Sequence, residues 1–232
     1  MLEIRLFKVN QLRNPDTPVF SYFATMLKNN KYLLEWCIDD AIASLPHFHK
    51  VDQVEWCSRL DMDGLTPDLA LASQVFNNSP VPVKIMLRNR AGDFVYSKKE
   101  VDEMIETGLR FRELGFDRFV FGAIRHDRLD MDSIYALAEA LAPAHICIHK
   151  AIDVSVHLIE DLRLLGEIQG IHEVLSSGGA ATAIEGAAKL KEMFATAPTG
   201  ITLIGAGKIT RENVEQHHEL LGLSAYHGKR MA

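Results

Sequence analysis

Short apolar segments alternate with longer amphipathic segments along most of this 232-residue chain. Each apolar segment has the length of one β-strand in a buried sheet, and the segments between repeat apolar residues at helical spacing. The pattern predicts strands at residues 33–38, 52–57, 82–87, 118–122, 145–149, 172–176, 201–205 and 223–227, and helices near 39–48, 67–78, 98–114, 131–141, 155–166, 182–195 and 210–221.

Regular alternation of strands and helices at this spacing is typical of parallel strands joined by helices. Eight such strands in a chain of this length favour an α/β fold of the (β/α)8 TIM-barrel type. Periodicity does not show whether a sheet closes, so an open doubly wound sheet is the alternative. Because no low-complexity linker divides the chain, we expect one barrel domain over residues 31–232.

The two ends of the chain depart from this alternation. Residues 1–30 contain a strand-like segment, LEIRLFKV, and a helix-like segment near 19–29, which we expect to form an N-terminal extension packed on the barrel. Only Gly228 to Ala232 follow the last strand, so the eighth outer helix would be short or missing. Phe20, Phe23 and Leu27, at helical spacing, would cover the gap, and a partner subunit is the alternative.

Composition narrows the possible functions. A net charge of −6 and a pI near 5.9 disfavour binding to nucleic acid or to an anionic membrane. Three cysteines are too few, and odd in number, for a disulfide framework, which favours a reducing cytoplasm. The N-terminal apolar run contains charges, unlike a signal peptide, and no run approaches the ~20 residues that span a bilayer.

The triplet Glu-Trp-Cys ends both the first and the second predicted strand, in LLEWC and QVEWC. Because side chains on a strand alternate between faces, Glu35 and Cys37 share one face, as do Glu55 and Cys57, and the tryptophans take the other. In a barrel, helices cover the outer face, which suits tryptophan. The glutamates and cysteines would then point into the lumen and its C-terminal mouth, where barrel active sites lie.

Each of these inward residues also has a purely structural interpretation. Free cysteine is often a small buried hydrophobe. A buried carboxylate needs a partner, for which Arg88, Arg90 and Lys150 are available, and an ion-pair network that only shapes the lumen is the alternative to an acid–base site. Cys37 and Cys57 would come close enough on adjacent strands to share one soft ion, and thiolates favour Cu(I).

Further strand ends carry residues suited to an anionic ligand. The third strand continues into RNRAGDF, where Arg88 and Arg90 offer forks for a carboxylate or phosphate, with an ion pair to Asp93 as the alternative. Strands six and seven end in SSGG and GAGK, whose small residues allow backbone amides to approach an anion, although glycine turns also occur for steric reasons. The residues expected there are Ser177, Gly178, Gly205 and Gly207.

Two histidines complete the predicted mouth. Strand five ends in HKAID, which places His149 and Lys150 at the mouth with Asp153 able to orient one of them. His227 ends the eighth strand. A histidine in such a place is either a proton carrier or a hydrogen-bonded core residue. No glycine pattern matches a nucleotide-binding motif, so we expect no nucleotide cofactor.

In this order, the motifs resemble those of the CutC family from about Tyr32 to Arg230. The resemblance lies in EWC, in VEWC followed by DGLTP, in RNRAGDFVYS, in IHKAID, in LSSG, in GAGKITREN and in AYH. It implies a cytoplasmic (β/α)8 barrel, often a homo-oligomer such as a dimer, with a role in copper homeostasis. Lys150, Asn89 and Ala91 depart from the family pattern of Arg, Pro and Gly, which affects the expected anion site.

Two functions therefore remain open, and with them the question whether the protein is an enzyme. In the first, the protein binds or carries Cu(I) through Cys37 and Cys57. In the second, it acts on a small phosphorylated or carboxylated substrate, with two arginines binding the anion and His149 moving a proton. Glu35 or Glu55 would then be the complementary acid or base. The expected partner is a copper ion or a small anion.

Overall fold

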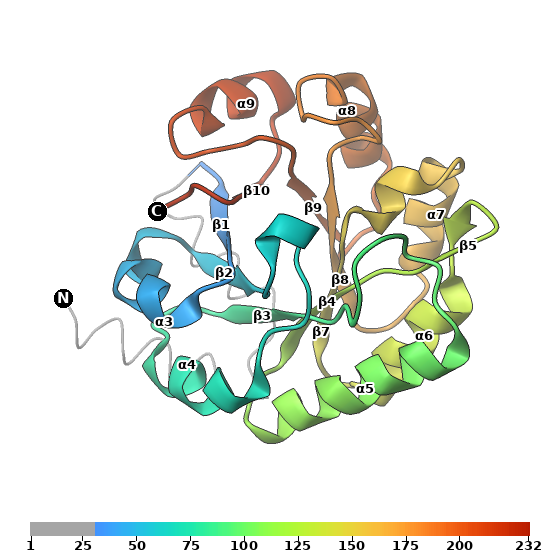
Figure 1. The fold of residues 1–232 in the computed structure, drawn as a ribbon. Coiled ribbons are helices and arrows are strands. Elements are labelled where there is room, and N and C mark those ends of the chain that lie inside the picture. The colour runs from blue at the N-terminus through green and yellow to red at the C-terminus, as the bar shows by residue number, and fades with distance from the viewer. Residues whose placement is uncertain (1–30) are drawn as a thin grey trace.

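The computed structural model describes residues 31–232, in which eight parallel strands close into a barrel (Figure 1). Around the barrel the order is β1, β10, β9, β8, β7, β4, β3 and β2, with β2 returning to β1. The closure confirms the predicted (β/α)8 barrel and excludes the open sheet. The strands are β1 (Leu33–Ile38), β2 (Gln53–Trp56), β3 (Val83–Met86), β4 (Arg118–Phe121), β7 (His145–Ile148), β8 (Ile171–Ser176), β9 (Thr202–Gly205) and β10 (Ala225–Gly228).

Helices connect successive strands on the outside of the barrel, one in each segment where the sequence predicts a helix. They are α3 (Ala41–Ser44), α4 (Ala72–Asn78), α5 (Lys98–Glu113), α6 (Met131–Ala140), α7 (Leu158–Leu165), α8 (Ala187–Thr196) and α9 (Val214–Leu221), and α3 continues into the 3-10 helix η1 (Leu45–Lys50). The hairpin of β5 (Ile124–Arg125) and β6 (Arg128–Leu129) and the 3-10 helices η2 (Leu60–Met62), η3 (Leu69–Leu71) and η4 (Lys150–Val154) add detail that the periodicity does not predict.

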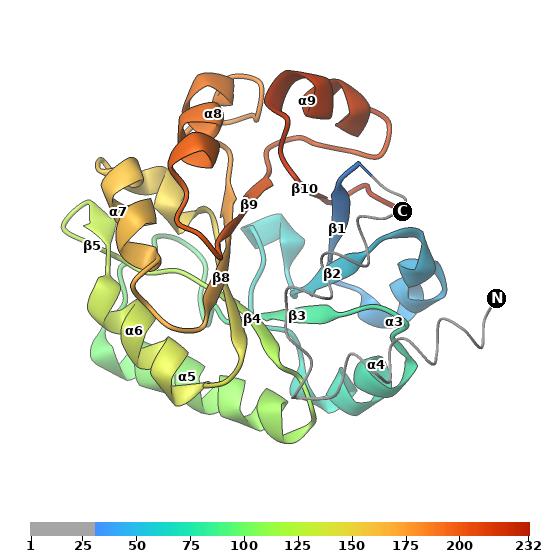
Figure 2. The same ribbon diagram turned by 180° about the vertical axis from the view of Figure 1, so that it is seen from behind.

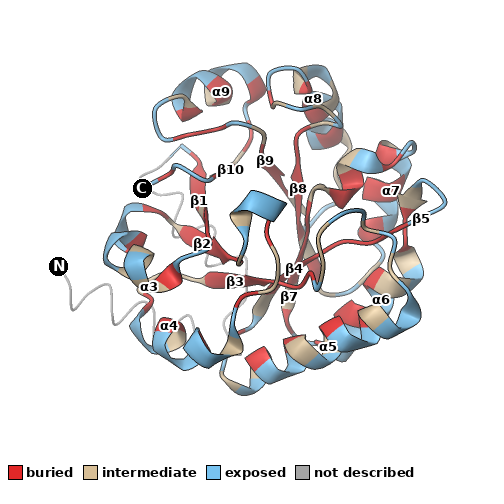
Figure 3. Ribbon diagram, in the orientation of Figure 1, coloured by how far each residue is buried: buried red, intermediate tan, exposed pale blue. Residues whose placement is uncertain are grey.

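The strands are largely buried (Figure 3), and their apolar side chains belong to two separate clusters, one outside and one inside the barrel. Trp56 faces outward and packs edge-on against Phe111 of α5, with ring centroids 6.2 Å apart. Trp36 also faces outward, against Phe48 of η1. Cys37 and Cys57 belong to the separate apolar cluster inside the barrel, together with Cys147 from β7 and other inward residues. The alternation predicted for the two Glu-Trp-Cys triplets is confirmed.

The loop between β3 and α5 is fixed by a capping box. The Ser97 hydroxyl accepts a hydrogen bond from the Glu100 backbone N–H, while the Glu100 carboxylate accepts from the Ser97 N–H. Such a box satisfies backbone donors that the first turn of a helix leaves free. Glu100 also accepts a 2.5 Å hydrogen bond from Arg90 Nε. The helix terminus therefore anchors the loop that follows β3 at the barrel mouth.

Within residues 31–232 no helix follows β10, and α9 and α3 flank the outer faces of β10 and β1 (Figures 1 and 2). The four residues after β10 cover part of this position. Trp36 Nε1 donates to the Lys229 carbonyl at 3.0 Å, and the Met231 side chain is fully buried. The missing eighth helix is thus confirmed for this part of the chain. The proposed extension, including Phe20, Phe23 and Leu27, lies outside the described residues.

Candidate functional site in the barrel lumen

A buried ammonium group lies at the centre of the lumen. Lys84 of β3 pairs with Glu35 of β1 and with Glu173 of β8, the latter at 2.9 Å. Gln53 of β2 joins the two carboxylates, with its Nε2 donating to Glu35 at 2.6 Å and to Glu173 at 3.2 Å. All four side chains are buried. One lysine, two glutamates and one glutamine therefore form a closed polar layer across the barrel.

Within this layer, Lys84 and Glu35 hold each other ionised. Burial alone would raise the pKa of Glu35, but the charges of Lys84 and His227 and their hydrogen bonds lower it to about 2. Burial also disfavours the ammonium form of Lys84, yet the adjacent carboxylates raise its pKa well above the usual value. A lysine that stays charged is a structural counter-ion rather than a nucleophile.

His227 of β10 links this layer to the mouth. Its Nδ1 lies 2.7 Å from Glu35 Oε1, and its Nε2 lies 4.0 Å from Glu55 Oε1. Burial opposes protonation of the imidazole, but the carboxylate of Glu55, together with Cys37 and Glu35, raises the pKa of His227 well above its usual range. The histidine is therefore positioned to hold a proton between two glutamates.

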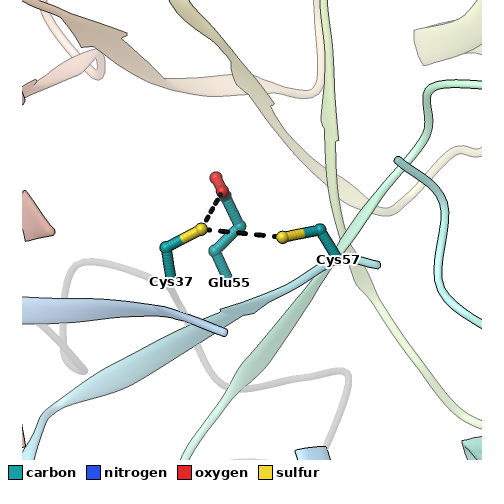
Figure 4. A group of neighbouring side chains, drawn as sticks. All are labelled: Cys37, Glu55 and Cys57. Carbon is teal, nitrogen blue, oxygen red and sulfur yellow. Dashed lines mark hydrogen bonds between the residues drawn. The ribbon is translucent and has the colours of Figure 1, made fainter. Parts of the chain in front are cut away.

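Two thiols, those of Cys37 and Cys57, meet beside the carboxylate of Glu55, as Figure 4 shows. Cys37 Sγ lies 3.6 Å from Cys57 Sγ and 3.2 Å from Glu55 Oε1, to which it donates. Cys57 Sγ donates to the Ile38 carbonyl at 3.2 Å. All three cysteines of the chain are free and buried. Cys37, Cys57 and Glu55 each offer a ligand atom within 4.8 Å of the others.

The surroundings of the Cys37 thiol and of Glu55 favour their protonated forms. The hydrogen bond to Cys57, burial and the nearby Glu55 carboxylate raise the pKa of the Cys37 thiol. Burial and the charge of Glu35 raise the pKa of Glu55, against the opposing charge of His227. Glu55 Oε2 is buried and has no hydrogen-bond partner within residues 31–232. The glutamate thus keeps one oxygen free beside the two sulfurs.

The predicted arginines at the end of β3 have different surroundings from the lumen glutamates. The guanidinium of Arg88 is buried and donates to the backbone carbonyls of Met62, Gly64 and Gly92 at 2.8–3.1 Å. Arg90 pairs with Glu100 and, at 3.1 Å, with Asp93. The expectation that these arginines partner the lumen glutamates was wrong, because Lys84 and His227 take that place. For Arg90, the alternative ion pair with Asp93 is confirmed.

Asp153 occupies the turn for which an external anion was predicted. Its carboxylate accepts from the hydroxyl of Ser176, from the N–H and hydroxyl of Ser177, and from the N–H of Gly179 at 2.5–2.9 Å. Lys150 Nζ lies 3.8 Å from the same carboxylate. The backbone N–H groups of Ser177 and Gly179 therefore already donate to a carboxylate of the protein itself.

The glycines of the mouth have steric roles. A Cβ on Gly178, where φ is +71°, would lie 2.4 Å from the Gly186 carbonyl oxygen. A Cβ on Gly207, where φ is +105°, would lie 2.8 Å from the Ala183 nitrogen. Gly205 packs against Leu223 and Tyr226. Only glycine fits such close approaches of backbone to backbone, so the turns need no ligand to account for them.

His149 lies apart from the thiols, at the end of β7. Its Nδ1 accepts a hydrogen bond from the Ala151 N–H at 3.0 Å, and its ring lies 4.7 Å from the ring of Phe94 between centroids. Of the predicted residues, the structure therefore brings together Glu35, Cys37, Glu55, Cys57 and His227 as one group. Arg88 and His149 meet around Phe94 as a second group.

Sequence reasoning missed Lys84, Gln53 and Glu173. The signal was present, since strand alternation places Lys84 on the same face of β3 as Met86, and Glu173 on the same face of β8 as Leu175. A lysine inside an apolar run is the signature of a buried counter-ion. Applying to β3 the same inward–outward alternation that was used for the Glu-Trp-Cys strands would have identified Lys84 as an inward residue.

A known family model, described as the CutC family, matches residues 32–232. The chain belongs to the CutC family. A CutC family protein of Glaesserella parasuis serovar 5 is 32% identical over 186 residues, covering 79% of this chain and 76% of that protein. The human copper homeostasis protein cutC homolog is 31% identical over 202 residues, covering 85% of this chain and 73% of the human protein.

The fold of the family is also shared with a solved structure. The crystal structure of CutC from Streptococcus agalactiae superimposes with a TM-score of 0.81 at 26% identity, covering 87% of this chain and all of the streptococcal chain. These comparisons confirm the resemblance stated from the motifs. Among residues 31–232, no helix is both long and apolar enough to cross a bilayer.

Proposed function

We propose that this CutC chain binds Cu(I) as cargo through the thiol pair Cys37 and Cys57. The observation that carries the proposal is the 3.6 Å separation of the two sulfurs, on adjacent strands and without a disulfide. Soft thiolate ligands select Cu(I) over harder divalent ions. The names of the human and streptococcal relatives, both called copper homeostasis proteins, support the same ion.

The surroundings of the pair fit a cation that displaces protons. Both sulfurs must lose their protons to bind a metal ion, and the free oxygen of Glu55 is one acceptor beside them. The Lys84 layer below already pairs Glu35 and Glu173, so those carboxylates are not free to bind a cation. Three free thiols are stable in a reducing compartment, which supports a cytoplasmic location.

The test is an anaerobic Cu(I) titration in competition with a chromophoric Cu(I) chelator. The wild type should take up one Cu(I), and the Cys37→Ser/Cys57→Ser variant should lose affinity by at least about a hundredfold, since hard hydroxyls replace both soft ligands. Cys147→Ser is the matched control, because Cys147 is also a buried lumen thiol but lies on β7. Unchanged affinity in the double variant, or an equal loss in Cys147→Ser, would rule out the pair.

A second candidate function is acid–base chemistry on a small anionic substrate. The observation in its favour is a pair of perturbed groups with Glu55 Oε1 and His227 Nε2 4.0 Å apart: burial raises the pKa of Glu55, and the Glu55 carboxylate raises the pKa of His227. Perturbed acids of this kind cluster at active sites. If Glu55 is a general acid, Glu55→Gln should bind a substrate but not turn it over, whereas Cys57→Ser should leave turnover intact. Screening small carboxylates and phosphate esters for turnover tests this function separately.

A further inference from the structure

Arg88 is a buried cation without an anionic partner. Only 3% of its surface is exposed, and no carboxylate of the described residues lies within ion-pair distance. Its terminal nitrogens donate to three backbone carbonyls, but the Nε–H has no acceptor in the same part of the chain. Because buried charges are normally paired, an anion bound beside this guanidinium would be stabilised.

The imidazole of His149 presents a second unpaired donor. Its Nδ1 accepts from the Ala151 N–H, so in the neutral ring the hydrogen is on Nε2. Burial, and then the charge of Arg88, lower the pKa of His149 to about 3, which keeps the ring neutral at physiological pH. His149 Nε2 is buried, and nothing in residues 31–232 accepts its hydrogen.

The loop after β3 brings these donors around one aromatic ring. The Phe94 centroid lies 4.9 Å from Arg88 Cζ and 4.7 Å from the His149 ring centroid. Tyr96, two residues further on, has a buried hydroxyl without a partner in the described chain. Burial raises the pKa of Tyr96, and the charge of Arg88 and its hydrogen-bonding proximity oppose that shift, so the phenol lies directly beside the guanidinium.

The end of β4 is shaped to admit the imidazole. Gly122 directly follows β4, and a Cβ there would lie 2.7 Å from His149 Nδ1. The backbone N–H of Ile124 donates to the Phe94 carbonyl at 2.8 Å, which fixes the loop over this strand end. Three buried polar atoms without hydrogen-bond partners, Arg88 Nε, Tyr96 Oη and His149 Nε2, thus lie in the segments that follow β3 and β7, on the C-terminal side of the barrel.

We propose that Arg88, Tyr96 and His149 form a binding site for a small carboxylate monoanion. The guanidinium supplies the charge, and the Arg88 Nε–H, the His149 Nε2–H and the Tyr96 hydroxyl supply hydrogen bonds to the carboxylate oxygens. The charge balance selects the class of anion. One unpaired positive charge is present, because Arg90 is already neutralised by Asp93 and Glu100. A phosphate dianion would leave a negative charge buried without a partner.

This site is independent of the thiol pair. No hydrogen bond or ion pair of the described chain joins Arg88, Tyr96 or His149 to Cys37 or Cys57. Binding of a carboxylate is therefore expected to survive the loss of both thiols. Measuring it in the Cys37→Ser/Cys57→Ser variant separates this proposal from the proposed Cu(I) site, since either can fail alone.

Acetate is the probe, and isothermal titration calorimetry with a parallel thermal-shift series is the measurement. The key variant is Tyr96→Phe, which removes one unpartnered hydroxyl and should fold normally. It should weaken acetate binding by about tenfold, the effect of losing one hydrogen bond to a charged acceptor. Tyr135→Phe is the matched control, because the Tyr135 hydroxyl is exposed and bonds only to Glu139. Arg88→Lys, which lacks the Nε donor, should abolish binding.

The outcomes decide the proposal. Acetate binding that is weakened by Tyr96→Phe and unaffected by Tyr135→Phe supports the site, even if Arg88→Lys fails to fold. Absence of acetate binding in the wild type would overturn it, and the three donors would then hold water only. Inorganic phosphate that binds more tightly than acetate would overturn the assignment of a monoanion. Equal acetate affinity in the wild type and Tyr96→Phe would place the ligand elsewhere.

Discussion

Lys84 of β3 reaches across the lumen to Glu173 of β8, with 2.9 Å between Nζ and Oε2. The same ammonium contacts Glu35 of β1. None of these three strands is adjacent to another in the barrel order. One buried lysine therefore ties together three separate parts of the closed sheet, and its charge is essential to both carboxylates.

We predict that Lys84→Met will destabilise the protein by about 3–5 kcal/mol, because it leaves two buried carboxylates without their cation while conserving most of the volume. Urea unfolding monitored by circular dichroism measures the change. Lys98→Met is the control, since Lys98 pairs with Asp102 on the exposed surface and should have little effect. Adding Glu35→Gln and Glu173→Gln to Lys84→Met should restore much of the loss. A small effect of Lys84→Met alone would contradict this account.

The sequence predicted the barrel because the two periodicities, of strands and of helices, are local properties of each segment. It also predicted which residues of the Glu-Trp-Cys strands point inward, and Cys37, Cys57 and Trp56 lie as expected. The partner of Glu35 was predicted wrongly. Candidate cations were sought at strand ends, whereas Lys84 lies within an apolar strand, where only the face assignment reveals it.

The loops at the mouth were not predictable in the same way. The direction of the Arg88 guanidinium, toward three backbone carbonyls, depends on how the loops after β2 and β3 fold against each other. The hydrogen bond from the Gly179 N–H to Asp153 depends on the position of the 3-10 helix η4, which has no periodic pattern in the sequence. Contacts between distant loops leave no local pattern in a single sequence.

A pH dependence of stability follows from His149. Its folded pKa of about 3 lies below the unfolded value near 6.5, so in this window the unfolded state binds a proton that the folded state does not. The free energy of unfolding should therefore fall as the pH falls from 6.5 toward 3. Between pH 7 and pH 5 the contribution of this one group is about 2 kcal/mol. The measurement is urea unfolding at several pH values.

The variant His149→Asn does not titrate, so it should lose less stability than the wild type over this range. Burial and the charge of Arg118 also lower the pKa of His145 to about 3. His145 should therefore preserve part of the pH dependence of stability in this variant. His47→Asn is the control, because His47 is exposed on η1. In this variant the free energy of unfolding should change with pH as it does in the wild type. Parallel curves for His149→Asn and the wild type would show that His149 is not the group that titrates.

The C-terminal residues should contribute to stability because Met231 is fully buried at the position where an eighth helix would lie. We predict that Met231→Ala will destabilise the protein by about 2–5 kcal/mol, the usual cost of truncating a buried methionine. The control is Met62→Ala, since Met62 is 40% exposed and should change stability little. Thermal unfolding measures the loss of stability in each variant. An equal loss in the two variants would show that the C-terminal residues do not cover the strands.

A groove remains beside this tail, and it motivates the last prediction. It has a volume of about 440 Å³ and is lined by Tyr32, which precedes β1, by Leu34 of β1, by the turn before β2 and by the start of α9. Lys31 also lines it, so the preceding segment 1–30 enters the described structure at its edge. We predict that Phe20, Phe23 and Leu27 occupy this position in place of the missing helix.

Deleting residues 1–30 should then lower the melting temperature of a protein that keeps its oligomeric state, because each bare apolar side chain costs about 1.5–3 kcal/mol. Full-length Phe20→Ser/Phe23→Ser/Leu27→Ser should reproduce most of the loss, since it removes the apolar face but not the segment. The rival is that a partner subunit covers the groove through the same segment. In that case analytical ultracentrifugation should show a dimer for the full chain and a monomer after the deletion. A stable monomer with an unchanged melting temperature would refute the substitution, because the strands would then need no cover beyond the one that Met231 provides.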